Sequence, residues 1–160
     1  MKGFWMTGLD DLDRKILTEL QRQADTPLDA LGQKVGLSRN ACWRRIKALE
    51  AAGVIRARVA LLDAAQVGLP LTVFMQIRAA AHDADWLDRF ARTTRAMPQI
   101  QGVYRMTGDL DYLICARVAD MADYDRLYQT LIAQVPMGDV SASFVMEEIK
   151  HSTELALSKA

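Results

Sequence analysis

The 160-residue sequence predicts an α+β protein, in which an N-terminal winged helix-turn-helix domain precedes a ferredoxin-like βαββαβ domain. Two patterns support this prediction. Apolar residues recur at helical spacing up to about residue 52, and from residue 71 strand-like and helical stretches alternate. We place the first domain at 9–56, an extended connector at 57–70 and the second domain at 71–157.

The first domain is expected to contain three short helices. Asp10 can cap the first, Pro27 suits the first turn of the second, and Ser38 can cap the third, which runs to about Ala52, where Gly53 stops it. Between the last two, Gly36 supplies a left-handed turn. The apolar stripe of the first helix consists of Leu9, Leu12, Ile16, Leu17 and Leu20.

The second domain follows the order β-α-β-β-α-β, which is typical of an antiparallel sheet with both helices on one face. The opposite face then lacks a cover, and a second copy of the chain is the usual solution. The expected elements are strand 71–79, helix 83–96, strands 100–107 and 112–118, helix 121–135 and strand 140–149.

Basic residues are concentrated at 34–58, where seven Lys or Arg residues accompany one acidic residue, Glu50. The whole chain has no formal net charge. Residues 9–60 hold ten basic and seven acidic residues, whereas 61–160 hold nine basic and thirteen acidic ones. This asymmetry indicates a first domain that binds a polyanion and a second domain with another task.

The third helix has the composition of a reader of the DNA major groove. Its helical phase turns Cys42, Ile46 and Leu49 inward and leaves polar, aromatic and basic side chains outside. Arg and Lys recognise guanine, Asn recognises adenine, and an aromatic edge contacts a thymine methyl group or a sugar. The predicted DNA-binding residues are Ser38, Arg39, Asn40, Trp43, Arg44, Arg45 and Lys47.

An ordinary solvated helix face is the alternative interpretation of this charge. The spacing of Gly36 and Ser38 argues against it, because it also provides the turn of a helix-turn-helix. An outward Trp43 argues against it too, since an exposed indole is unfavourable unless a partner covers it.

Several segments of the sequence resemble the Lrp/AsnC (feast/famine) family of transcriptional regulators. The DNA-binding half is similar in LDDLDRKILTELQ, VGLSRNACWRRIKALEAAGVI and VALLDAAQVGL, and the effector-binding half in YRMTGDLDYLICARVADMADY and SASFVMEEIKHSTELAL. The resemblance covers nearly all of residues 9–157. Within the family, ACWRRIKALE and MPQIQGVYRMTGDLDYL are most similar to the branch that includes cysteine-responsive detoxification regulators.

The resemblance implies a homodimer formed through the second domains, which assembles further into tetramers or octamers and binds double-stranded DNA. It also implies a small-molecule effector, usually an amino acid, bound between dimers near residues 106–112, and the branch resemblance makes cysteine a candidate. Many members carry paired hydroxyls before the Phe of the last strand, whereas this chain has Ala142 and Ser143, so Ser141 is the candidate substitute.

The segment TGDLDY contains groups suited to a zwitterionic amino acid. Backbone amides at a turn allowed by Gly108 can hold a carboxylate, Asp109 or Asp111 can pair with an ammonium group, and neighbouring aromatic and Met side chains can border an apolar one. Simple hairpin chemistry is the alternative. The predicted effector-binding residues are Tyr104, Met106, Thr107, Gly108, Asp109, Asp111, Tyr112, Ser141 and Ser143.

We predict no catalytic residue, metal site or cofactor, because His82 and His151 are isolated and no phosphate-binding Gly loop occurs. Cys42 and Cys115 lie 73 positions apart without a CxxC motif, which indicates reduced thiols in a cytoplasmic protein. No apolar run is long enough to span a membrane. The alternative function is an architectural DNA-organising protein with a vestigial effector pocket.

Overall fold

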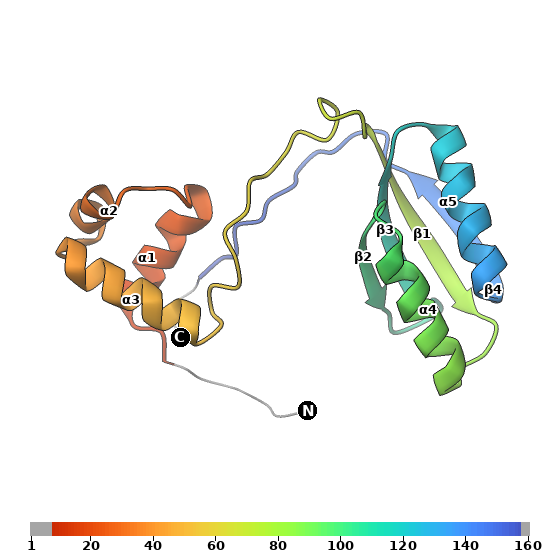
Figure 1. Cartoon of the computed structure of the whole chain (residues 1–160), viewed down its shortest axis with the longest axis horizontal. Helices are drawn as coiled ribbons and strands as arrows, with labels where there is room; N and C mark the ends of the chain where they lie inside the picture. Colours follow the sequence, from red (N-terminus) through yellow and green to blue (C-terminus); the bar gives the residue numbers. More distant parts are fainter. Residues whose placement is uncertain (1–7, 158–160) are drawn as a thin grey trace. The chain divides into compact units, whose positions relative to one another are not determined.

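The computed structural model describes residues 8–157 (Figure 1). These residues form two compact units, one made of 8–60 together with 150–157 and the other of 61–149. The division differs from the predicted one at the C-terminus, since residues 150–157 were assigned to the second domain and instead pack within the first unit.

The first unit contains the three expected helices, α1 (Asp11–Arg22), α2 (Leu28–Val35) and α3 (Arg39–Ala51). Asp10 caps α1 by accepting a hydrogen bond from the Asp13 backbone N–H at 2.8 Å. Apolar side chains of all three helices form one core, which consists of Ile16, Leu17, Leu31, Val35, Cys42, Ile46 and Leu49.

The predicted wing is not seen, because no strand occurs among the described residues of this unit. The backbone N–H groups of Val54 and Ile55 both donate to the carbonyl of Leu49, which folds the chain back on the end of α3. The chain then runs on without pairing, and a wing requires two paired strands.

The α2–α3 turn depends on two glycines. Gly36 ends α2 in the left-handed region, with φ of 75°, as the sequence predicts. Gly32 is buried, and a Cβ there would lie only 2.5 Å from the backbone oxygen of Leu37. The chain on the way into α3 therefore passes directly against α2, and only glycine leaves it room.

The second unit has the predicted ferredoxin-like topology. Its elements are β1 (Leu71–Ala79), α4 (Ala84–Ala96), β2 (Ile100–Arg105), β3 (Tyr112–Val118), α5 (Met121–Gln134) and β4 (Met137–Phe144). The strands pair antiparallel in the order β2-β3-β1-β4, and the two consecutive β-α-β halves therefore interleave in one sheet.

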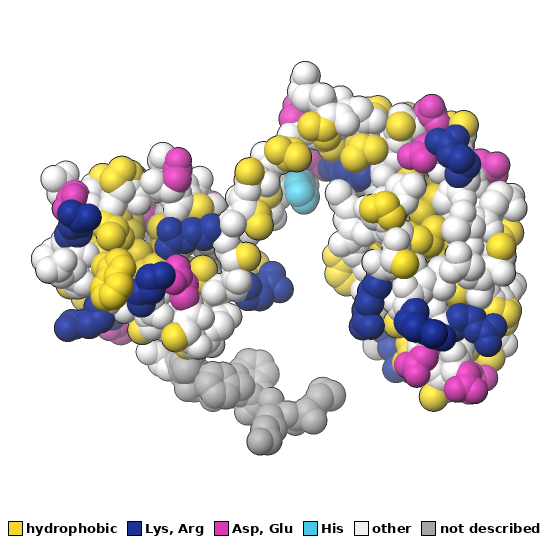
Figure 2. Space-filling model, viewed as in Figure 1, with side chains coloured by type: hydrophobic (Ala, Val, Ile, Leu, Met, Phe, Trp, Pro, Cys, Tyr) yellow, Lys and Arg dark blue, Asp and Glu magenta, His cyan; other side chains and the backbone are white. Residues whose placement is uncertain are grey.

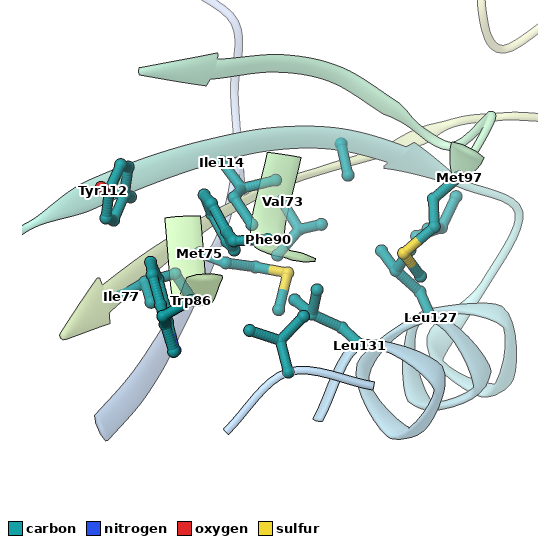
Figure 3. Close-up of a cluster of buried hydrophobic side chains, with 13 residues drawn as sticks. Val73, Met75, Ile77, Trp86, Phe90, Met97, Tyr112, Ile114, Leu127 and Leu131 are labelled. Carbon is teal, nitrogen blue, oxygen red and sulfur yellow. The ribbon is translucent and has the colours of Figure 1, made fainter. Parts of the chain in front are cut away.

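The core of the second unit lies between the sheet and its two helices (Figure 3). Val73, Met75 and Ile77 of β1 point into it and are completely buried. Trp86 of α4 is also buried, and its indole N–H donates to the carbonyl of Pro136 at 2.6 Å. This bond ties the start of α4 to the chain that follows α5.

The last strand is shifted from its predicted position. It was expected at 140–149 and is found at Met137–Phe144. Its partner β1 begins at Leu71 directly after Pro70, and the final backbone bond runs from Val145 N to the carbonyl of Thr72 at 2.9 Å. Only Leu71 of β1 lies beyond that point, so the pairing of β4 ends there.

Candidate DNA-binding face and effector site

Helix α3 presents the face that the sequence predicts. Cys42, Ile46 and Leu49 are buried, and the Ser38 hydroxyl caps the helix by accepting from the Ala41 N–H at 3.3 Å. Burial raises the pKa of the Cys42 thiol, so it stays protonated in the core. The opposite side of α3 is therefore free to meet a partner.

The outward side combines an aromatic surface with basic side chains. Asn40, Arg44 and Lys47 are exposed, and Trp43 leaves 53% of its surface in solvent. Figure 2 shows Lys and Arg side chains spaced around a hydrophobic patch on the first unit. Such an arrangement offers donors for base edges and phosphates around one large apolar contact.

Ion pairs divide the predicted basic residues into two groups. Arg45 is directed inward, since its Nη1 lies 2.8 Å from both Asp10 Oδ2 and Asp13 Oδ1 and its side chain is only 28% exposed. The two carboxylates raise the pKa of the Arg45 guanidinium. This could not be predicted locally, because the acidic partners lie more than thirty positions away at the cap and first turn of α1.

The other basic side chains of α3 keep more freedom. Lys47 pairs with Glu50 at 2.7 Å on the surface, and Arg39 lies 4.0 Å from Asp29. Exposed pairs of this kind are weak and exchange readily for another anion. Arg44 takes part in no ion pair among the described residues, so on α3 its charge is the least engaged by other side chains.

The β2–β3 hairpin is shaped largely by its own backbone. Gly108 has φ of 98°, and the Met106 N–H donates to the carbonyl of Asp111 at 2.9 Å. The Asp111 carboxylate accepts from the Ala79 N–H at 2.8 Å. Asp111 therefore stabilises the end of β1, whereas Thr107 and Asp109 stay exposed at the turn.

Tyr112 does not lie exposed beside the turn, where it was expected to border an apolar side chain of the ligand. Its ring is buried against Trp86 and Phe90, with ring centroids 5.5 and 4.7 Å away. Tyr104 lies on the other side of the sheet and is exposed. Its ring covers Gly102, where a Cβ would lie 2.7 Å from the phenolic oxygen.

The sheet face away from the helices carries both Tyr104 and the candidate serines, but at opposite edges. Tyr104 of β2 faces Leu113 of β3. Leu113 faces Gln76 of β1, and Gln76 in turn faces Ser141 of β4. Three strand spacings of about 4.8 Å separate Tyr104 from Ser141 by about 14 Å, too far for one amino acid to contact both.

The alternation of β4 also settles which of its side chains share this face. Val140, Ala142 and Phe144 pack against the core, so Ser141 and Ser143 point to the open side. Ala142 therefore removes no hydroxyl from the open face. No group of acidic, His or Cys side chains suited to a metal ion occurs within residues 8–157.

Two family profiles match the chain in sequence order. The AsnC-type helix-turn-helix domain matches residues 9–50, and the Lrp/AsnC ligand binding domain matches residues 72–155. None of the helices in the described part of the chain has the length and apolarity to cross a bilayer.

Whole-chain relatives agree with both profiles. The glutamate uptake regulatory protein of Zymomonas mobilis is 52% identical over 149 residues, covering 93% of this chain and 91% of that protein. The DNA-binding transcriptional activator DecR of Escherichia coli is 43% identical over 150 residues, covering 93% and 99%. The crystal structure of the transcriptional regulator NMB0573 of Neisseria meningitidis in complex with L-Met is similar with a TM-score of 0.88 and 36% identity, covering 92% and 96%.

Proposed function

The chain belongs to the Lrp/AsnC family of DNA-binding transcriptional regulators, and on that premise we propose that Asn40, Trp43 and Arg44 contact DNA bases. The observation that supports this most is the exposed, unpaired Arg44 beside the exposed Trp43 on α3. Ser38, Arg39 and Lys47 serve the phosphate backbone, since they lie at the start and flank of the same helix. Arg45 positions α3 through its carboxylate partners.

Replacing Arg44 with alanine tests this role. Loss of one base contact weakens DNA binding by about 1–3 kcal/mol, which is roughly five- to a hundredfold. A gel-shift titration at fixed salt compares R44A with R89A, which removes the same charge from an exposed position of helix α4. Equal affinities for R44A and R89A would remove Arg44 from the DNA-binding face.

The effector is proposed to be an amino acid held at the hairpin. Backbone amides near Gly108 hold its carboxylate and Asp109 its ammonium group, with Tyr104, Met106 and Thr107 around the side chain. Asp111 contributes by holding the hairpin on β1. The L-Met complex of the Neisseria relative and the name of the Zymomonas one support this ligand class.

Ser141 and Ser143 reach such a ligand only from a second copy, because they lie across the sheet from Tyr104. We therefore propose a homodimer through the open sheet face that assembles further into tetramers or octamers, in the cytoplasm where DNA is bound. Phe74 and Leu113 lie on the open face, since each pairs in register with a residue of that face. Sedimentation of the intact chain measures the assembly.

A thermal-shift screen of the twenty amino acids, with cysteine, methionine and glutamate as first candidates, identifies the effector. A ligand at a hundred times its Kd stabilises the native state by about 2.7 kcal/mol. Calorimetry then compares wild type with D109A, which should lose ligand affinity but retain basal DNA binding. Full ligand affinity in D109A would exclude that carboxylate from the site.

An architectural DNA-organising role is the second candidate function. A missing hydroxyl at Ala142 would favour this role by impairing the effector site, but that side chain faces the core instead of the open face. Footprinting distinguishes the two functions, since a regulator protects a few defined sites and an organiser coats DNA according to its length.

A further inference from the structure

The C-terminal segment packs on α1 of the DNA-binding unit. The Leu155 N–H donates to Gln21 Oε1 at 2.7 Å, and Gln21 Nε2 donates back to the Leu155 carbonyl at 3.2 Å. One side-chain amide thus satisfies both backbone groups of one residue, as a neighbouring strand would. These two hydrogen bonds therefore fix which residue of the segment lies opposite Gln21.

Two further contacts flank this pair. Glu154 forms an ion pair with Arg22 at 3.0 Å, and Leu157 packs against the core of the three helices. The ion pair is exposed and adds little by itself, but the apolar contact fixes the end of the segment. Contacts at 154, 155 and 157 together form the first anchor.

The second anchor lies in the ligand-binding unit, directly after β4. Glu148 forms an ion pair with Arg117 of β3 at 3.3 Å, and the Arg117 side chain is only 20% exposed. Arg117 pairs in register with Thr72 and lies on the open face of the sheet with Cys115. The segment thus begins at the face that we assign to dimer formation.

The two connections between the units differ in reach. Six residue steps separate Glu148 from Glu154, which limits those anchors to about 20 Å apart. The other connection runs from Arg58, which pairs with Glu50, to Leu71 and allows about 45 Å over thirteen steps. The shorter connection therefore limits the distance between the two units.

We propose that residues 148–157 form a strap that restricts how far the DNA-binding unit can move from the ligand-binding unit. The strap starts at the open face of the sheet and ends on α1, which shares its core with α3. A change at that face that displaces Glu148 would thereby alter the range over which the recognition helix can move. This inference concerns the chain itself and holds whether or not the proposed effector and DNA contacts are correct.

The test measures the distance between the units with spin labels. Labels are attached at Q33C on α2 and D125C on α5, both exposed, in a C115S background, while the buried Cys42 does not react. The labelled full-length chain is mixed with excess unlabelled chain, so that only distances within one chain contribute.

Two insertions of six Gly/Ser residues are compared, each adding up to about 20 Å of reach. The first lies between Ile149 and Lys150 and lengthens the strap. The matched control lies between Val59 and Ala60, in the longer connection, and all four residues are exposed. A third variant, Q21A, releases Leu155, and hydrogen exchange at the Leu155 amide confirms the release.

The strap insertion should at least double the width of the distance distribution, and the control insertion should leave it unchanged. Q21A should broaden the distribution less than the strap insertion, because Leu157 still holds the end of the segment. An unchanged width in the lengthened strap, with Leu155 still protected, overturns the proposal. An equal broadening by the control insertion overturns it as well, because the longer connection would then be the limit.

Discussion

Replacing Gly32 with alanine tests how closely the recognition helix is held. The new methyl group would lie 2.5 Å from the backbone oxygen of Leu37, about 0.9 Å inside an ordinary contact. A backbone oxygen cannot turn aside as a flexible side chain does, and the Leu37 N–H is bonded to the Gly32 carbonyl at 2.9 Å. The contact between the new methyl group and the Leu37 oxygen can therefore be relieved only if the α2–α3 turn opens.

Two effects of opposite sign decide the magnitude. Alanine is favoured over glycine within a helix by about 1 kcal/mol, and steric overpacking costs about 1–3 kcal/mol. We expect a net loss of about 1 kcal/mol, which lowers the melting temperature of the first unit by about 4–8 °C. DNA affinity should fall as well, because α3 is displaced.

Calorimetry and gel-shift titration measure both quantities, with Q33A as control. Gln33 is the exposed neighbour on the same helix, and its replacement should change stability by no more than about 0.5 kcal/mol. A G32A variant that melts at or above wild type and binds DNA equally would refute the tight approach of α2 to Leu37.

Three further predictions concern side chains that hold elements together. W86F removes the indole hydrogen bond to the carbonyl of Pro136, so chemical denaturation followed by circular dichroism should show a loss of about 0.5–1.5 kcal/mol, and an unchanged midpoint contradicts it. D13N removes a partner of Arg45 and should weaken DNA binding severalfold without changing the salt slope; a shallower slope would indicate a lost phosphate contact instead. The hydrogen bond from the Ala119 N–H holds the pKa of the Asp123 carboxyl below its ordinary 3.8. The stabilisation by the ionised Asp123 carboxylate is therefore complete above about pH 4 and is lost on acidification. The free energies of unfolding of wild type and D123N, measured by urea titration, should converge below that pH.

Periodicity predicted most of the fold. The stripe of Cys42, Ile46 and Leu49, the capping Ser38 and the order of the second-domain elements are local patterns, and the structure confirms each. The end of β4 could not be predicted in this way, because it depends on where its partner β1 begins at Leu71.

The site was less predictable, because its residues acquire partners from distant parts of the chain. Arg45 has the composition of a DNA contact, yet acidic residues of α1 hold it inward. Tyr112 follows a turn motif, yet strand alternation buries its ring. The separation of Tyr104 from Ser141 follows from strand order, which no local pattern contains.

The strap was missed for a related reason. Residues 150–157 show no helical or strand periodicity, and the family resemblance continued through them as part of the effector domain. The only local signal is a Leu at 155 and another at 157, and these could have packed on either unit. Gln21, which binds Leu155, looks like an ordinary polar residue at the end of α1.

The central claim is that the outward side of α3 reads DNA sequence, and selection from random DNA tests it most directly. Wild type, R44A and R89A are each used to enrich binding sites, and the base preferences are compared. The account predicts that R44A loses its preference at one base pair in each half-site, while R89A keeps the wild-type profile. An R44A profile identical to wild type, with affinity lowered uniformly, would show that Arg44 contacts only phosphate.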